Sequence, residues 1–556
     1  MRKGARAAVA GGVFAVLLGV AGCGGGDSSG PDGGAAGDAP AARKKTGPPD
    51  ATEVEDTAER FLKAWAAGDA AGAAALTDDP EAAETALTSF RKDAHVSEVE
   101  LRAGRPTGAK VAFTVDARIA FQGKRAPLTY SSALTVVRDE AAGKAVVDWA
   151  PAVVHPKLRA GDTLRTGPAE APPIKAVDRD GKELRAADHP ALKAVLDGLR
   201  ERYGDEAGGT AGVETYIARA DGEGKDKGKG GAGEKDGDAG KLPDETLKVL
   251  SKGTPGTLRT TIDADLQSAA ERAVGSRPKA AVVAVKPSTG EILAVANSPA
   301  DGFNMAFQGS LAPGSTMKVI SSAMLIDKGL AGYGKQHPCP KFFSYGGWKF
   351  QNDDKFEITG GTFAQSFARS CNTAFISQAP KLSDDDLTKE ARDVFGIGLN
   401  WQVGVATFDG AVPVQKDAPM AASLIGQGGV RMNPLNMASV AATVRSGVFR
   451  QPYLVAPSLD GRALAKAPRA LKPSTAEQLR DLMRLTATSG TAAKAMAGVG
   501  GDMGAKTGSA EVDGQEKPNG WFTAYRGDLA AAAVVPASGH GGDTAGPIVA
   551  SVLKAG

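Results

Sequence analysis

The stretch Pro313-Gly314-Ser315-Thr316-Met317-Lys318-Val319-Ile320 predicts the start of a buried helix that carries a nucleophile and its base. The Pro-Gly pair ends whatever precedes it, and apolar and small residues follow as far as Ile326, so we expect the helix to begin near Ser315. Residues three apart share a helical face, which places Ser315 beside Lys318. A hydroxyl needs an adjacent base, and a lysine is that base only when burial or another cation lowers its pKa.

A single Ser-x-x-Lys is a weak signal, because the chain holds a second copy at Ser276 and Lys279. There Pro278 disfavours helical backbone at the residue before it, so that pair is not expected to share a helical face. Two further elements follow Ser315-x-x-Lys318 along the chain. They are Ser370-Cys371-Asn372 and Lys506-Thr507-Gly508, and the second of them lies at a predicted strand. In this order the three elements are the motif set of penicillin-binding proteins and class A β-lactamases.

Residues 257–556 accordingly resemble a penicillin-binding transpeptidase domain. Two apolar strands near 281–285 and 292–296, a long helical stretch, three later strands and a closing helix near 545–554 predict an antiparallel sheet covered by helices on both faces. This is the α/β fold that the resemblance shares with serine β-lactamases. The supporting motifs are Thr261-Ile262-Asp263 with Leu266-Gln267, Lys286 to Ala294, Ser370 to Phe375, Gly426 to Gly429, and Ser489 to Ala492.

The resemblance implies a role for each site residue. Ser315 would form an acyl-enzyme while neutral Lys318 takes its proton, and Lys506 would keep Lys318 deprotonated. Ser370 would relay the proton to the leaving amine, because a hydroxyl both donates and accepts. The backbone N–H groups of Ser315 and Ser509 would form the oxyanion hole. The substrate-binding set is Asn372, Lys506, Thr507, Gly508 and Ser509.

The substrate implied by the resemblance is the D-Ala-D-Ala end of a peptidoglycan stem peptide. The enzyme would expel the last D-Ala and pass the acyl group to an amine on a neighbouring stem, and β-lactams would trap Ser315. Residues 52–256 are too short, and of the wrong character, for a glycosyltransferase domain, which fits a monofunctional class B protein. Three alternatives stay open: a D,D-carboxypeptidase, a serine β-lactamase, and a non-catalytic β-lactam sensor.

The β-lactamase alternative requires a base that activates water against the acyl-enzyme, which class A enzymes supply as a glutamate. From residue 387 through Gly504 the only glutamates are Glu390 and Glu477. Both lie in segments that we interpret as helices with a solvated face. Neither shows the Glu-x-x-x-Asn spacing typical of the β-lactamase loop, so we expect a long-lived penicillin adduct.

Residues 52–165 predict a small α+β domain. Val54, Ala58, Phe61, Leu62 and Trp65 form one helical stripe ended by Gly68, and strand-like alternation follows around 111–115, 128, 134–136 and 146. The segment resembles the N-terminal domain of methicillin-resistance-type penicillin-binding proteins, a curved antiparallel sheet with helices of the nuclear-transport-factor type. That resemblance implies slow reaction with β-lactams, and hence antibiotic resistance.

Residues 166–256 are interpreted as an abbreviated pedestal or linker. Within it, residues 221–240 hold eight glycines, two alanines and ten charged residues, a composition that cannot form a core and predicts a disordered insert.

The N-terminus predicts export. Arg2, Lys3 and Arg6 precede an apolar run at 7–20, which is short for a membrane-spanning helix. Val20-Ala21-Gly22-Cys23 resembles a bacterial lipobox, so we expect a signal peptide at 1–22, a lipid on Cys23 and a flexible tether at 23–51. An uncleaved anchor or an ordinary signal peptide are the alternatives. The protein would then work at the extracytoplasmic face of the membrane, with other cell-wall synthesis proteins as possible partners.

The net charge and the histidines bear on which ligands are expected, and the two remaining cysteines bear on a disulfide. The net charge of +2 gives no basic face for nucleic acid, and five scattered histidines show no metal-ligand spacing, so neither a cofactor nor a metal is expected. Cys339 and Cys371 would lie in an oxidising compartment. A disulfide between them would brace the Ser-x-Asn loop, and two buried free thiols are the equal alternative.

Overall fold

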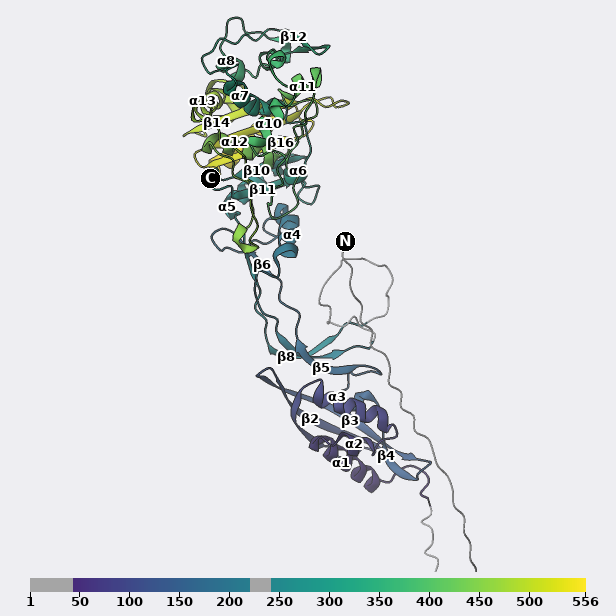
Figure 1. Ribbon diagram of the computed structural model, residues 1–556. Helices are drawn as coiled ribbons and strands as arrows, with labels where there is room; N and C mark the ends of the chain where they lie inside the picture. The colour runs from purple at the N-terminus through teal and green to yellow at the C-terminus, as the bar shows by residue number, and fades with distance from the viewer. Residues whose placement is uncertain (1–43, 221–241) are drawn as a thin grey trace, which may run out of the picture. The chain divides into compact units, whose positions relative to one another are not determined.

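The computed structural model describes residues 44–220 and 242–556 (Figure 1). The predicted signal peptide, Cys23, most of the tether and the insert at 221–240 lie outside the described residues. The described chain falls into two compact units. One contains residues 44–85, 101–114 and 131–156, and the other contains 86–100, 115–130 and all described residues from Lys157 onward.

The N-terminal segment begins with the predicted amphipathic helix, α1 (Ala51–Ala67). Asp50 and Glu53 form a capping box at its start, and Gly68 ends it with a left-handed backbone, φ 81°. All five residues of the predicted stripe are buried. The alternation around 128 and 134–136 belongs to one long strand, β3, and not to two. The other elements are α2 (Ala70–Ala74), α3 (Pro80–Lys92), and the four-stranded sheet β1-β2-β3-β4 of Val96–Ala103, Lys110–Phe121, Lys124–Asp139 and Lys144–Asp148.

The middle segment contains more regular structure than a linker. β5 (Thr163–Pro168), β7 (Val213–Ala218) and β8 (Glu245–Ser251) form an antiparallel sheet in the order β5-β7-β8. β6 (Lys175–Val177) pairs in parallel with β9 (Thr257–Arg259). The remaining elements are the short turns η1 (Pro151–Val153) and η2 (Pro190–Leu192) and the helix α4 (Lys193–Tyr203).

The C-terminal domain is built on the predicted five-stranded sheet, in the order β11-β10-β16-β15-β14 with every neighbouring pair antiparallel. Its strands are β10 (Ala280–Val285), β11 (Ile292–Ser298), β14 (Met503–Ala510), β15 (Asn519–Arg526) and β16 (Leu529–Val535). A hairpin of β12 (Phe342–Tyr345) and β13 (Trp348–Gln351) stands apart. The helices are α5 (Ala264–Gly275), α6 (Met305–Gln308), η3 (Gly314–Met317), α7 (Lys318–Asp327), η4 (Asp353–Lys355), α8 (Phe363–Ala368), α9 (Thr373–Ile376), η5 (Ala379–Lys381), α10 (Asp386–Asp393), α11 (Asp417–Ser423), α12 (Pro434–Ser446), η6 (Pro457–Leu459), α13 (Pro473–Ser489), α14 (Ala493–Met496) and α15 (Gly541–Ala555).

Helices cover both faces of this sheet, as the sequence pattern predicts. Every residue of β10 is buried, and its side chains alternate between two hydrophobic cores. Val283 and Val285 belong to the core that contains α12 and α7, whereas Val282 and Ala284 belong to the core that contains α5 and α15. The strands of a sheet that is buried on both faces have continuous apolar sequences. This is why β10 and β16 show no alternation of polar and apolar residues.

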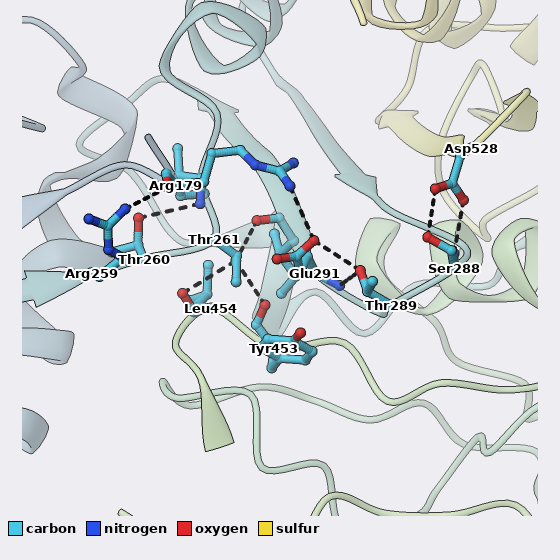
Figure 2. A network of polar contacts seen from close by, with 12 residues as sticks. Arg179, Arg259, Thr260, Thr261, Ser288, Thr289, Glu291, Tyr453, Leu454 and Asp528 are labelled. Atoms are coloured by element: carbon cyan, nitrogen blue, oxygen red, sulfur yellow. Dashed lines mark hydrogen bonds and ion pairs between the residues drawn. The ribbon is translucent and has the colours of Figure 1, made fainter. Parts of the chain in front are cut away.

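The motif at Lys286–Ala294 joins the middle segment to the sheet (Figure 2). Glu291 forms an ion pair with Arg179, the two side chains lying 3.4 Å apart. Thr261 Oγ donates to backbone carbonyls at Ile292 and Tyr453, at 2.7 and 3.0 Å. Ser288 Oγ donates to Asp528 at 2.6 Å. The Lys286–Ala294 motif, which supports the family resemblance, therefore has a structural role away from Ser315.

Membrane-spanning and metal-binding features were searched only among residues 44–220 and 242–556. No helix there is both long and apolar enough to cross a bilayer. No cluster of three or more His, Cys, Asp or Glu residues there has the geometry to hold a metal ion.

Candidate active site

Ser315 lies in a tight turn and not at the first residues of an α-helix. The sequence predicts a helix beginning near Ser315, whereas the structure has the 3₁₀ turn η3 first and starts α7 at Lys318. Gly314 explains the turn: its φ is +53°, and a Cβ there would lie 2.5 Å from the carbonyl oxygen of Ser509. The turn is thereby pressed against β14, and Ser315 still lies on the same side as Lys318.

Lys318 is fully buried and contacts three predicted site residues. Its Nζ lies 3.0 Å from Ser315 Oγ, 2.7 Å from Asn372 Oδ1 and 3.3 Å from Ser370 Oγ. It also donates to the backbone carbonyl of Ser370 at 2.7 Å. The predicted nucleophile and the predicted base are therefore within hydrogen-bond distance of each other.

Lys506 is a second buried lysine, on β14, on the far side of Ser370. Its Nζ donates to Ser370 Oγ at 2.8 Å and to the carbonyl of Thr507 at 3.0 Å. Ser370 Oγ thus lies between two amines, one of which contacts the nucleophile. A hydroxyl in this position can accept a proton from one side and donate one to the other.

The electrostatics favour a neutral Lys318. Burial is the main cause that holds the pKa of Lys318 well below its usual value, the charge of Lys506 is the second, and Asp353 opposes both. Burial also lowers the pKa of Lys506, to about 7. The sequence names both burial and a second cation as causes of a lowered pKa of Lys318, and the structure ranks desolvation first and the charge of Lys506 second.

The residues after Lys506 present a free strand edge. β14 is the last strand of the sheet, so one side of its backbone is not paired within the sheet. Thr507 Oγ1 lies 2.6 Å from Thr491 Oγ1, which belongs to the Ser489–Ala492 motif. A side chain at position 508 would clash with the turn before Ser315, because a Cβ on Gly508 would lie 2.8 Å from the carbonyl oxygen of Pro313. Ser509 Oγ lies 3.3 Å from His540 Nδ1.

Asn352 fixes the Ser-x-Asn loop, and sequence reasoning missed it. It is buried, and its Oδ1 accepts from the backbone N–H groups of Asn372 at 2.8 Å and Thr373 at 3.0 Å. Its Nδ2 donates to the carbonyls of Phe356 at 2.8 Å and Pro340 at 3.0 Å. The only sequence signal was a polar residue directly after an alternating segment, which is too common to be informative.

Cys339 and Cys371 form a disulfide, so the structure decides between the two open alternatives. Their Cα atoms are 6.2 Å apart, inside the range that a disulfide spans. Both cysteines are fully buried. The bond ties the residue between Ser370 and Asn372 to the segment before β12.

The interpretation of Glu390 as part of a solvated face is wrong. Its side chain on α10 is buried between that helix and α7, where it forms an ion pair with Arg469. Burial raises the pKa of Glu390 to about 7, against the opposing effect of Arg469. The amphipathic pattern fails because the charged partner comes from a distant loop. Glu477 is exposed, as expected.

Comparison with known proteins identifies two domains. Residues 280–554 match the family described as the penicillin binding protein transpeptidase domain, and residues 53–162 match the NTF2-like N-terminal transpeptidase domain. The peptidoglycan D,D-transpeptidase PbpA of Mycolicibacterium smegmatis (strain ATCC 700084 / mc(2)155) is 30% identical over 328 residues, which are 49% of this chain and 64% of that protein. PbpA of Mycobacterium tuberculosis (strain CDC 1551 / Oshkosh) is 28% identical over 366 residues, 54% and 72% of the two chains.

A solved structure supports the fold. A chain from a peptidoglycan synthase complex superposes with a TM-score of 0.55 at 21% identity, over 72% of this chain and 92% of that one. At this identity the likeness concerns the fold alone. Along this chain, the match to the NTF2-like N-terminal transpeptidase domain precedes the match to the penicillin binding protein transpeptidase domain.

Proposed function

We propose that this protein is a serine D,D-transpeptidase that cross-links peptidoglycan stem peptides. The observation that carries the proposal is the position of Lys318 Nζ, buried and 3.0 Å from Ser315 Oγ. A buried amine with a lowered pKa is neutral at physiological pH and can take the proton of the hydroxyl. Relatives named as peptidoglycan D,D-transpeptidases support the same reaction.

The acylation half of the reaction uses the contacts of the resting site. Ser315 Oγ attacks the carbonyl of the penultimate D-Ala as Lys318 accepts its proton. The C–N bond to the last D-Ala then breaks, and the leaving amine receives a proton through Ser370, whose hydroxyl lies 3.3 Å from Lys318 Nζ. The backbone N–H groups of Ser315 and Ser509 stabilise the oxyanion between these states.

Substrate binding uses β14 and the Ser-x-Asn loop. An extended D-peptide adds to the free edge of β14 and pairs with its backbone. Lys506 and Thr507 bind the terminal carboxylate, one by charge and one by its hydroxyl. Asn372, at the other side of Lys318, binds the amide of the bond before the scissile one. Gly508 leaves the strand edge clear for this approach.

Catalytic hydrolysis of penicillin is disfavoured over a stable acyl-enzyme. A class A β-lactamase uses a glutamate to activate water at the ester carbon. Glu390 is buried in an ion pair with Arg469, and Glu477 lies exposed on α13, so neither carboxylate contacts Ser315. A D,D-carboxypeptidase, with water as the acceptor, would share every contact described above and differs only in the second half-reaction.

Intact-mass spectrometry after mixing with penicillin G tests the proposal. We expect one adduct per chain on Ser315, lasting far longer than a turnover, and no adduct on Ser315→Ala. The match of residues 53–162 to the NTF2-like N-terminal transpeptidase domain supports the further expectation that the adduct forms slowly, as a role in antibiotic resistance would require. Rapid hydrolysis of penicillin without an adduct would reject the transpeptidase function in favour of a β-lactamase.

The N-terminal motif supports anchoring at the extracytoplasmic face of the membrane. Val20-Ala21-Gly22-Cys23 is the basis for a lipid on Cys23, after which the tether reaches the first folded residues. We expect metabolic labelling with a fatty acid to mark the wild type and not Cys23→Ala. Label that persists in the variant would contradict this anchor. Other cell-wall synthesis proteins would be its partners there.

A further inference from the structure

Two exposed polar residues, Asp353 and His540, lie beside the reacting groups without a role in the mechanism above. His540 Nδ1 is 3.3 Å from Ser509 Oγ and 3.5 Å from Asp353 Oδ2. The pair therefore connects the first residue of η4 with the residue directly before α15. The side chain of Asp353 is 65% exposed and that of His540 is 62% exposed, so both are accessible to a ligand from solution.

Both residues are anchored close to Ser315. His540 contacts Ser509, whose carbonyl oxygen packs against Gly314, the neighbour of the nucleophile. Asp353 directly follows Asn352, which binds the Ser-x-Asn loop, and its charge acts on Lys318. Two independent segments thus bring a carboxylate and an imidazole to the exposed side of the site.

The second half of the proposed reaction needs such a pair. The acceptor is a primary amine, and an alkylamine with a pKa of about 10 is protonated at neutral pH. An ammonium is not a nucleophile, and the positive charge of Lys506 would repel it from the ester. A carboxylate offsets that repulsion, and a neutral imidazole can remove the proton.

The existing contact between the pair does not prevent ligand binding. An exposed contact of this kind is weak, because water solvates both partners and holding two side chains together costs entropy. An ammonium can therefore displace the imidazole from Asp353 at small cost. The imidazole then lies next to the bound ammonium, where it can accept a proton.

We propose that Asp353 and His540 form the binding site for the acceptor amine of the cross-linking reaction; this rests on the proposed transpeptidase function. Asp353 binds the ammonium, and one N–H proton passes to neutral His540. The free amine attacks the acyl carbon, and the ester bond to Ser315 Oγ breaks. The second amine proton returns to Ser315 through Lys318, and His540 releases its proton to water.

The test compares two nucleophiles on the same acyl-enzyme. The full chain is acylated with an N-benzoyl-D-alanyl thioester, and product formation is followed with D-alaninamide, which is mostly cationic at pH 7, or hydroxylamine, which is mostly neutral. We expect Asp353→Asn to lower transfer to D-alaninamide by about 10-fold or more and to leave transfer to hydroxylamine within about 2-fold. His540→Gln should lower the rate of transfer at saturating D-alaninamide. Asp353→Asn should instead lower the apparent affinity of the acyl-enzyme for D-alaninamide.

Two controls separate this inference from the function on which it rests. Penicillin acylation should not fall in Asp353→Asn, because Asp353 raises the pKa of Lys318 and its loss favours the neutral base. Asp354→Asn changes the neighbouring exposed carboxylate and should behave as wild type. If the wild type transfers to D-alaninamide and Asp353→Asn does so equally, the acceptor site is wrong and the function stands. If the wild type forms no acyl-enzyme, the proposed function itself fails.

Discussion

Lys318→Met should lower the rate of penicillin acylation by about 10³-fold or more, because Lys318 is, among the described residues, the only base within hydrogen-bond distance of Ser315 Oγ. Methionine has a similar volume and no charge, so a fully buried site can accept it without a cavity. The variant should still unfold cooperatively, at a Tm lowered by the loss of the donor to the Ser370 carbonyl and to Asn372 Oδ1. Stopped-flow acylation with a fluorescent penicillin measures the rate, and calorimetry measures the Tm.

The matched control is Lys279→Met, at the chain's second Ser-x-x-Lys. Lys279 is exposed, and its substitution should change neither quantity. Acylation of Lys318→Met at more than a tenth of the wild-type rate would show that another group takes the proton.

The pH dependence of the wild-type rate follows from the same two lysines. Lys318 acts as the neutral base, so the rate rises with pH as it loses its proton. Lys506 acts as a cation, so the rate falls as pH rises through its pKa of about 7. The result is a bell-shaped profile whose two limbs belong to the coupled pair. Lys506→Arg should remove the alkaline limb, since arginine stays protonated.

Asn352→Ala should lower the free energy of unfolding by about 3 kcal/mol or more and acylation by about 100-fold. The substitution leaves the N–H groups of Asn372 and Thr373 and the carbonyl of Phe356 without their buried partner, and each such loss costs about 1–3 kcal/mol, whereas the carbonyl of Pro340 keeps the hydroxyl of Thr373 as a donor. The loop that bears Ser370 then loses its position relative to Lys318. Urea unfolding and the acylation assay measure the two effects.

Asn400→Ala, at an exposed asparagine, is the control for the loss of an amide side chain and should leave both quantities unchanged. Asn352→Asp keeps the acceptor for the two N–H groups and loses the donor, so its effect should be intermediate. Normal acylation by Asn352→Ala would mean that the disulfide alone holds the loop.

Local sequence determined much of the fold and the first pair of the site. Helical spacing placed Ser315 beside Lys318, and the structure keeps them 3.0 Å apart although a 3₁₀ turn replaces the first helical residues. The apolar runs at β10 and β11 predicted a sheet buried on both faces, because only such a sheet needs no polar side. These features depend on neighbours along the chain, which a pattern can show.

Tertiary structure decided whatever depends on residues distant in sequence. Spacing alone cannot show that burial, more than Lys506, lowers the pKa of Lys318, since desolvation depends on the surrounding core. The solvated face expected for Glu390 was wrong because Arg469 and α7 cover it. The pairing of Cys339 with Cys371 and the contact of Asp353 with His540 join segments that only the folded chain brings within bonding distance.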